Sequence, residues 1–492
     1  MRKLLAAARG GGGYQPPASN NLIASGPYSS ALTVSETVLT QVHCHTNKSD
    51  GSFSPAAVVA DYLSAGYGAL AITDHDKVTS QPAGITTAIP ANELSPTQQH
   101  IIGINTTYTR GVTTDAQAII DAIVADGGSA QIAHPKWVRG MTYAEMAALT
   151  GYAGMEIHNA KVVGGSGQNP ITYPGYAMDR WDQLLAGRRD VWAFAVDDLH
   201  QIDAYNTYDI GRLQVFVQTN NVAGVAGRIA SGNFVADVSN HGVTPGFPTR
   251  TNSSVGVTCS GATRIEAWGP SGILASASGT TLSYAYGAEP YVRLVAVGDY
   301  TEAFGSALSH LWIALDGTWA VSGGTLNHTG DVNIRRIILR RHREGDFTAT
   351  VDAQHNGAGT DNAALMFNVL GSSYYYMVRF GASSVSGYNN RLSLAMTTSG
   401  SFPTTPPASV AFTAAAGTWY RIKLAYTSAT GTITAKIWDR DDTEPADWQV
   451  TWADTTWRNG GFGFRANRNV KFDNLYIDGF RTYYQPIALD AA

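Results

Sequence analysis

The sequence predicts a multidomain chain in which an α/β barrel is followed by all-β domains. At 492 residues the chain is longer than one hydrophobic core usually covers, so two or three domains are expected. From about residue 39 to 240, short apolar runs alternate with helix-like segments. After about residue 245, short strands rich in Thr, Val, Ile and Tyr follow one another, separated by Gly, Ser and Asp.

These changes of pattern predict five segments. The first is a Gly/Pro/Ser/Asn-rich arm that we expect to be flexible or to dock to a partner. The barrel comes next, followed by a small antiparallel β-sandwich-like module, a larger β-sandwich of the jelly-roll kind and a short tail. The predicted ranges, in that order, are 1–38, 39–244, 245–324, 325–485 and 486–492.

Composition narrows the class of protein. A net charge of -5 and a pI near 6.2 provide no electrostatic signal for nucleic-acid binding. Only 14% of residues are charged, which is typical of β-rich modules that work outside cells. Cys44 and Cys259 lie far apart and form no disulfide framework. No apolar run is long enough to cross a membrane, and the apolar stretch Leu4–Ala8 is too short for a signal peptide.

Within the first domain, strands and helices follow one another in the rhythm of βαβ units. A helix is predicted over Pro55–Ala65 before a strand at Ala69–Thr73, and a second helix over Thr114–Ala125 before the segment SAQIAHP. This order predicts a parallel sheet or barrel, in which catalytic groups gather at the carboxyl ends of the strands.

The segment QVHCHTNKSDG carries the first chemical signal. Alternation along a strand puts His43 and His45 on one side and Cys44 on the other, so the two imidazoles can face one metal ion. One histidine at a strand end is usually a satisfied core residue, but here the pattern recurs at five sites. Nitrogen and oxygen ligands without thiolates suit Zn, Mn or Fe and indicate a multinuclear site. The histidines are His43, His45, His75, His100, His134, His158 and His200, beside the carboxylates Asp50, Asp74, Glu93, Glu156, Asp197 and Asp198.

The motifs HCHTNKSDG, AITDHD, IPANELSPTQQHIIGI, IAHP, MEIHN and DDLH occur in this order over residues 39–240. As a set they resemble the PHP (polymerase and histidinol phosphatase) family of metallohydrolases. The resemblance implies a distorted TIM-like barrel with two to three divalent ions. It also implies three ligand sets: His43, His45 and Asp198 for the first ion; Glu93, as a bridge, with His100 and His134 for the second; and Asp50, His75 and His200 for the third. Glu93, Asp198 and His200 are the implied catalytic residues.

The chain departs from the family pattern in two places. Asn92 stands where the family often has Gly or an apolar residue, and Val196-Asp197 replaces the usual Gly-Ser. Asp197 could therefore replace Asp198 as a ligand. His158 stands where the family varies, and it is expected behind the ligands or facing the substrate. Asp74 is expected to orient a histidine.

Such ions lower the pKa of a shared water, which favours metal-dependent hydrolysis of a phosphomonoester or phosphodiester. Lys136, Arg139 or Lys161 would neutralise phosphate oxygens, unless they are solvated surface charges. Some family members with a small β module after the barrel cleave carboxylic or carbamic esters, and the segments RIASGNFVADVSNHG and YVRLVAVGDYTEAFGSALSH resemble that arrangement.

The last domain resembles concanavalin A-like or laminin G-like jelly rolls through GDFTATVDAQ, TWYRIKLAY and VKFDNLYIDG. The resemblance implies glycan binding, with candidate stacking residues Tyr374, Tyr375, Tyr376, Trp438 and Trp448. The leading hypothesis is an extracellular or virion-associated hydrolase acting on a surface polysaccharide, such as a phage tail protein docked through its N-terminal arm. The alternatives are a non-catalytic glycan- or receptor-binding protein and an intracellular phosphatase with a β appendage.

Overall fold

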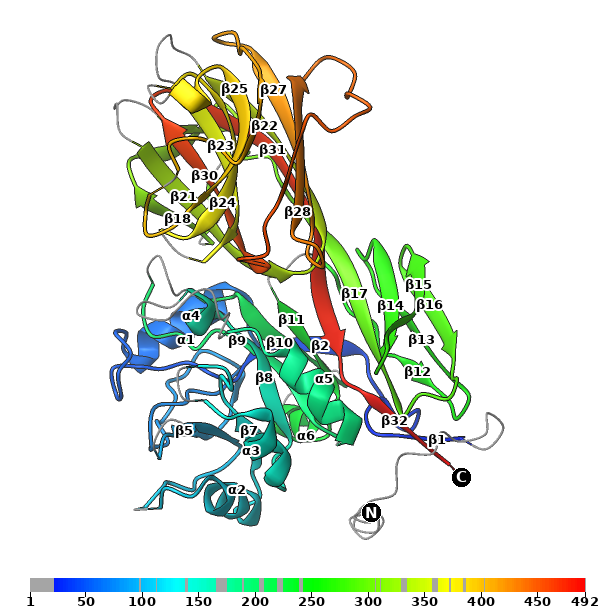
Figure 1. The fold of residues 1–492 in the computed structure, drawn as a ribbon. Helices are drawn as coiled ribbons and strands as arrows, with labels where there is room; N and C mark the ends of the chain where they lie inside the picture. The colour runs from blue at the N-terminus through cyan, green and yellow to red at the C-terminus, as the bar shows by residue number, and fades with distance from the viewer. Residues whose placement is uncertain are drawn as a thin grey trace.

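The structure is a computed structural model with three parts, a barrel, a small β module beside it and a large β-sandwich above both (Figure 1). It describes residues 22–491 except 97–98, 112, 138–139, 165–174, 188–189, 203–207, 219–223, 239–241, 306, 310, 329–333, 356–361, 371–372, 384–385 and 402. The chain is mostly β, with helices concentrated in the barrel.

The strands of the barrel can be followed in a closed ring. β2 pairs with β3, β3 pairs with β4, and β5 to β9 pair in order. Two parallel bridges complete the ring, one between His75 and Glu93 and one between Cys44 and Leu199. The strands are β2 (Glu36–Gln41), β3 (Ala69–Leu70), β4 (Thr87–Ala88), β5 (Ala91–Leu94), β6 (Ile101–Ile104), β7 (Ser129–Ile132), β8 (Gly154–Asn159) and β9 (Trp192–Val196).

One strand of the ring departs from the predicted parallel order. β6 runs antiparallel to both of its neighbours. The connection from Leu94 to Ile101 is too short for the crossover of a dozen or more residues that a parallel pair requires. The ring is therefore an irregular barrel.

Helices cover the outside of the ring, and their first residues explain where they begin. Ser54 caps α1, which has a proline at its start, and Asp115 caps α2 by accepting from two backbone N–H groups. Thr142 and Glu145 form a capping box at α3. The helices are α1 (Pro55–Ser64), α2 (Ala116–Ala125), α3 (Tyr143–Ala148), α4 (Ala160–Gly164), α5 (Met178–Gly187) and α6 (Val225–Ala230).

Two antiparallel strands join the barrel to the rest of the chain. β10 (Gly211–Val217) pairs with β2 and with β11 (Phe234–Val238), and β11 pairs with the long strand β31 (Val470–Tyr484). Asp237 accepts hydrogen bonds from Arg212 at 2.8 Å and from Thr482 at 3.1 Å. This buried contact ties the C-terminal strand to the barrel.

The small module includes both ends of the described chain. β1 pairs along its whole length with β32, which also pairs with β17. Residues from the predicted arm and the predicted tail are therefore strand neighbours, at one side of the molecule (Figure 1). The strands are β1 (Leu22–Ser25), β12 (Thr249–Arg250), β13 (Ser254–Thr258), β14 (Arg264–Gly269), β15 (Gly272–Ser278), β16 (Thr281–Ala285), β17 (Tyr291–Glu302) and β32 (Ile487–Ala491).

The large sandwich consists of two facing sheets. One has the order β18-β21-β30-β23-β24-β25-β26, and the other follows β19-β20-β31-β22-β27-β28-β29. The first contains β18 (Trp312–Asp316), β21 (Ile334–Glu344), β23 (Asn362–Val369), β24 (Tyr375–Gly381), β25 (Arg391–Thr397), β26 (Ala408–Ala411) and β30 (Asn459–Asn467). The second contains β19 (Trp319–Ser322), β20 (Thr325–His328), β22 (Phe347–His355), β27 (Trp419–Thr427), β28 (Thr432–Asp439) and β29 (Val450–Ala453).

The strand pairing divides the chain differently from the predicted ranges. Strands of the sandwich begin at Trp312, inside the range 245–324 predicted for the small module. The strand β31 pairs with sandwich strands in its first half and with β17 and β11 in its second half. One uninterrupted strand therefore belongs to two domains. The alternation of side chains along a strand does not reveal where its neighbouring strand changes.

The barrel and the sandwich share one hydrophobic core. Ala160, Tyr176 and Ile210 of the barrel belong to the cluster that fills the sandwich. No helix in the described ranges is long and apolar enough to span a membrane. Cys44 and Cys259 are both buried, free thiols.

Candidate metal centre

The first two histidines leave β2 at its carboxyl end. His43 and His45 are fully buried in the ring, while Cys44 points into a separate apolar cluster between α1 and β3. The segment continues the ladder beyond β2, because His45 donates its backbone N–H to Leu199 at 2.8 Å and Asp198 donates to His43 at 2.9 Å. Alternation therefore places both imidazoles inside the barrel.

Four ligand atoms converge around these two histidines. Their Nε2 atoms lie 3.1 Å apart, and Oδ1 of Asp198 lies 3.3 Å from each of them. Oε2 of Glu93 lies 3.3 Å from Nε2 of His43 and 3.1 Å from Nε2 of His45. Ligands bound to one ion at about 2.1 Å are themselves about 3.0–3.4 Å apart, so the donor set and its spacing fit a divalent metal ion.

Glu93 connects this group to a second one. While Oε2 faces the first group, Oε1 lies 2.8 Å from Nδ1 of His100 and 3.0 Å from Nε2 of His134. The side chain of Glu93 is almost completely buried, on β5. A carboxylate whose two oxygens face two sets of imidazoles is placed to bridge two ions.

A third group lies toward solvent. Oδ2 of Asp50 is 3.2 Å from Nε2 of His200 and 3.5 Å from Nε2 of His75. The side chain of Asp50 is 53% exposed and that of His75 is 27% exposed, in contrast to the buried first group. The structure thus brings together all nine residues predicted as ligands, which form four overlapping sets of donors.

The adjacent carboxylates Asp197 and Asp198 are separated by the fold. Oδ1 of Asp198 faces the histidines and has no hydrogen bond of its own. Asp197 instead points away from the centre and accepts hydrogen bonds from the Gln41 side chain and the Tyr62 hydroxyl, both at 2.9 Å. Three backbone N–H groups, of Asp209, Ile210 and Gly211, also donate to it at 2.7–2.8 Å.

Glu156 stands beside His158 in the sequence pattern, but sequence reasoning assigned it no role in the centre. Its Oε1 lies 2.6 Å from Nδ1 of His43, which directs the Nε2 of that ring to the ligand cluster, and its Oε2 accepts the backbone N–H of His134 at 2.7 Å. Asn159 donates to both Glu156 and Asp198. The motif MEIHN contained this signal, because a carboxylate beside ligand histidines commonly orients them.

Two of the residues in the centre have an uncommon backbone conformation. His134 has a φ of 23° and Asp198 a φ of 52°, in the left-handed region that non-glycine residues rarely adopt. Each such residue costs on the order of 1–3 kcal/mol. The surrounding strands hold the backbone in this conformation at both positions. Residues with such strained backbones cluster at functional sites, where the backbone directs the side chain.

The electrostatic field of the centre favours positive charge. Burial by itself would lower the pKa of His43, but Asp198, Glu156 and Glu93 outweigh it and hold this pKa well above its usual value. The same balance, with Asp198 and Glu93, raises the pKa of His45 to about 9. Burial would raise the pKa of Glu93, yet the surrounding histidines hold it well below its usual range. Ionised carboxylates in a buried cluster stabilise cations.

Two further predictions concern residues around the centre. Asp74 contacts the loop rather than a ring, because it accepts from the backbone and hydroxyl of Thr46 and from the Ser49 hydroxyl, each at 2.7 Å. Ser49 in turn lies 3.4 Å from Nδ1 of His45. His158 is buried, with its ring 5.1 Å from that of Tyr176.

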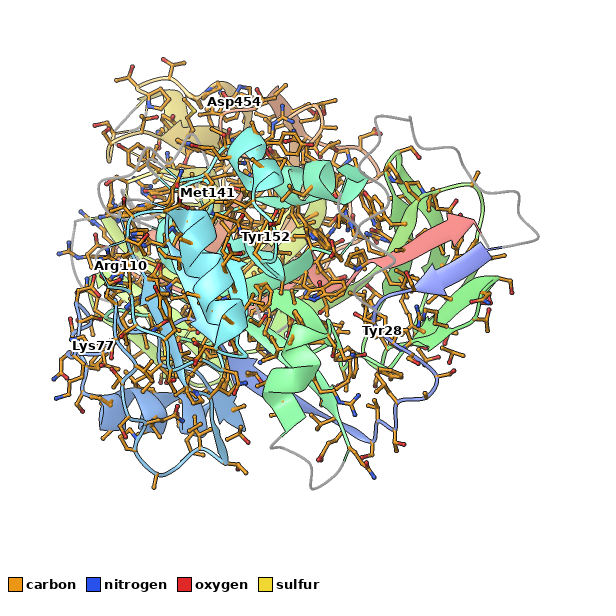
Figure 2. All side chains as sticks on the ribbon, turned by 90° about the horizontal axis from the view of Figure 1, so that it is seen from below. Tyr28, Lys77, Arg110, Met141, Tyr152 and Asp454 are labelled. Carbon is orange, nitrogen blue, oxygen red and sulfur yellow. The ribbon has the colours of Figure 1, made fainter. Side chains whose placement is uncertain are left out.

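The three positive charges predicted near the centre differ in their surroundings. Lys136 donates to Asp179 at 2.9 Å, Lys161 lies in α4, and Arg139 lies outside the described residues. Arg110, which the sequence did not single out, forms two hydrogen bonds of 2.8 Å with Asp76, next to His75. Figure 2 shows Arg110 and Lys77 on the same flank of the molecule, opposite Tyr28 of the small module.

Comparison with known proteins finds similarity only to solved structures. No family model matches the chain, and no curated protein matches it. A two-domain protein from Bacteroides vulgatus, described as containing a predicted PHP-like metal-dependent phosphoesterase, is similar over 58% of this chain and 94% of its own, at 13% identity and a TM-score of 0.32.

Two carbohydrate-binding proteins are similar over smaller parts of the chain. The carbohydrate-binding module CBM66 from Bacillus subtilis matches over 34% of this chain and 93% of its own, at 18% identity and a TM-score of 0.28. The basic winged bean lectin matches over 38% of this chain and 99% of its own, at 8% identity and a TM-score of 0.30. At these scores the likenesses carry no part of the functional argument.

Proposed function

We propose that the barrel is a metal-dependent hydrolase that binds two or three divalent ions and cleaves a phosphomonoester or phosphodiester. The position of Glu93 carries the proposal, because its two oxygens face two separate sets of imidazoles at 2.8–3.3 Å. Histidines that only pack in the core would not require one buried carboxylate shared between two sets of imidazoles.

Each ion would have its own set of ligands on this chain. The first would be held by His43, His45, Asp198 and one oxygen of Glu93. The second would be held by the other oxygen of Glu93 with His100 and His134. The third would be held by Asp50, His75 and His200. Imidazole and carboxylate ligands without thiolates suit Zn, Mn or Fe.

The ions, when bound, would lower the pKa of water and neutralise charge on the substrate. The chain's own residues would position the reaction. Glu156 fixes the ring of His43 through Nδ1, and Asn159 fixes the carboxylates of Glu156 and Asp198. The exposed third group marks the side from which substrate would enter. Trp137 flanks the second group, with its ring 5.4 Å from that of His100 and 5.1 Å from that of His134.

A polymeric substrate would use the sandwich as well. The helix α4, which follows directly from the carboxyl end of β8, lies below the sandwich (Figure 1), and Ala160 at its start belongs to the sandwich core. We include in the proposal that the substrate is a surface glycan or phosphate-bearing polymer, and that the setting is extracellular or virion-associated, with attachment through the N-terminal segment. The joint packing of the two domains supports the use of both by one polymeric substrate.

The test measures metal content and hydrolysis on the same samples. We expect two or three divalent ions per chain and metal-dependent turnover of a phosphomonoester and phosphodiester panel. Glu93→Gln should lose both, whereas Glu444→Gln, a matched change at an exposed glutamate of the sandwich, should lose neither. Fewer than one ion per chain under metal-replete conditions would refute the proposal. A full complement of ions with turnover only of carboxylic esters would favour the esterase alternative.

A further inference from the structure

His75 lies between two of the proposed ion sites. One set of converging donors includes His75 with Asp50 and His200, and another includes it with Glu93 and His100. Its Nε2 lies 3.5 Å from Oδ2 of Asp50, and its Nδ1 lies 3.3 Å from Oε2 of Glu93. A neutral imidazole binds a metal only through the nitrogen that carries no proton. The position of the proton therefore decides which ion the ring of His75 can bind.

The hydroxyl of Ser95 indicates where that proton lies. Its oxygen is 2.6 Å from Nδ1 of His75 and donates to the carbonyl of Glu93 at 3.5 Å. A hydroxyl has one hydrogen, so an Oγ that donates to the carbonyl accepts from the ring. The carboxylate of Glu93 beside the same Nδ1 also accepts when it is ionised. Both neighbours are satisfied when Nδ1 carries the proton, which leaves the lone pair of Nε2 facing Asp50.

A chain of contacts that begins at Arg110 holds Ser95 in place. The backbone N–H of Ser95 donates to Oδ1 of Asp76 at 3.0 Å. Arg110 donates from Nε and Nη2 to the two oxygens of Asp76, both at 2.8 Å, and from Nη1 to the carbonyl of Thr113 at 3.1 Å. A two-pronged arginine–carboxylate pair fixes the direction of the carboxylate as well as its charge. The carboxylate of Asp76 is therefore held where it accepts from Ser95.

The backbone of Asp76 provides a second bond to the same segment. Asp76 directly follows His75, and its N–H donates to the carbonyl of Glu93 at 2.9 Å. Its φ of 55° lies in the left-handed region, which is uncommon for residues other than glycine. The segment from Glu93 to Ser95 is thus bonded by both the backbone and the side chain of Asp76. These bonds keep the hydroxyl of Ser95 beside the ring of His75.

We propose that Ser95 is a positioning residue that keeps the proton of His75 on Nδ1 and so directs this histidine to the third ion. Asp76 and Arg110 hold Ser95 in this position. Without the hydroxyl, the carboxylates of Glu93 and Asp50 would both be acceptors for the one ring proton, and Nε2 would no longer be kept free for the ion. This role rests on the proposed function, because it requires that the barrel bind the third ion.

Zinc binding to the full chain tests the role of the hydroxyl. Titration in competition with a chromophoric chelator separates the ions by affinity. We expect Ser95→Ala to weaken one ion by about 10–100-fold and to leave the others unchanged, and Ser95→Thr, which keeps a hydroxyl, to restore the affinity. Ser231→Ala, which removes a hydroxyl at the end of α6 that donates to Gly227 at 2.8 Å, is the matched control. Unchanged zinc affinities in Ser95→Ala, or an equal loss in Ser95→Thr, would overturn the proposal.

Double variants identify the ion that is weakened. Ser95→Ala should add no loss to Asp50→Asn, because both changes act on the third ion, and it should add its full loss to His100→Gln, which acts on the second. The opposite pattern, with no added loss in His100→Gln and a full added loss in Asp50→Asn, would show that His75 serves the second ion. That result would overturn the proposal.

A change at the far end of the chain of contacts keeps every ligand and Ser95 itself, in case Ser95→Ala does not fold. Arg110→Gln should weaken the same ion by a smaller factor than Ser95→Ala. Arg421→Gln is the matched control, because Arg421 forms the same two-pronged pair with Asp352 in the sandwich, at 2.7 and 2.9 Å. Equal zinc affinities in Arg110→Gln and Arg421→Gln would overturn the role of Arg110.

The same titration separates a failure of this proposal from a failure of the proposed function. Fewer than one zinc ion per wild-type chain would refute the metal centre itself. Two or three tightly bound ions that do not respond to Ser95→Ala or Arg110→Gln would overturn only the role of Ser95.

Discussion

Asp197 and Asp198 are neighbours in the sequence, yet their carboxylates face opposite sides of the barrel wall. Asp198 has a φ of 52°, and its Oδ1 lies 3.3 Å from Nε2 of both His43 and His45. Asp197 is buried among five hydrogen-bond donors from Gln41, Tyr62 and the backbone that precedes and begins β10. The same conservative substitution, Asp to Asn, is therefore expected to have opposite effects at the two positions.

Asp197→Asn should destabilise the fold and leave the metal content of the folded protein unchanged. An amide in this position turns one acceptor into a donor that faces other donors, at a cost of about 2–4 kcal/mol. Asp198→Asn should reduce the metal content and activity with a much smaller effect on the metal-free protein. Tm in chelator and metal content after dialysis distinguish the two. A metal loss in Asp197→Asn that matches that of Asp198→Asn would contradict the assignment.

Glu156→Gln should weaken metal binding, although Glu156 is not itself a proposed metal ligand. Glu156 holds Nδ1 of His43 at 2.6 Å, and such supporting partners typically contribute about 10–100-fold to metal affinity. Competition with a chromophoric chelator measures the change. Glu145→Gln, at the exposed cap of α3, is the matched control and should leave the affinity unchanged. An affinity within twofold of the wild type would argue against the positioning role.

His158 should make the protein sensitive to acid. Burial lowers the pKa of His158 from its ordinary 6.5 to about 3, so this imidazole is neutral in the fold. Between these two values the unfolded chain binds a proton that the folded chain does not. The free energy of unfolding therefore falls as pH drops below about 6.5, by up to about 1.4 kcal/mol per pH unit.

Comparison with His158→Phe isolates this effect, because every other histidine is present in both proteins. The slope of unfolding free energy against pH, measured by urea titration between about pH 4.5 and pH 6.5, should be smaller in the variant. Parallel slopes in the two proteins would show that His158 does not contribute.

Gly51→Ala should disturb the third group of ligands alone. A Cβ at this position would lie 2.7 Å from the carbonyl carbon of His45 and 2.8 Å from the backbone nitrogen of Thr46, so the loop that carries Asp50 must shift. We expect one ion fewer per chain, with Tm in chelator close to that of the wild type. Gly227→Ala in α6, where a Cβ meets nothing within 4 Å, is the control. An unchanged metal stoichiometry would contradict the role of the loop.

Much of the cluster could be predicted from the chain alone because its histidines and carboxylates follow strand ends. Alternation predicted that His43 and His45 share one side of the chain just after β2, and the resemblance to the PHP family implied which further residues would meet them. The helices α1 and α2 begin next to cap residues that the sequence displays, Ser54 and Asp115. These are local properties, decided by residues within one turn or one strand.

Which residues and strands these local elements contact was decided only by the tertiary structure. The roles of Asp197 and Glu156 depend on backbone and side chains more than ten residues away, which adjacency in sequence does not reveal. The strand β31 serves both the sandwich and the small module, because hydrogen bonding along its edges depends on which strands lie beside it. Tyr375 and Tyr376, candidates for glycan stacking through the resemblance to jelly rolls, are buried for the same reason. Each residue's own chemistry was present in the sequence, whereas its neighbours were set by long-range packing.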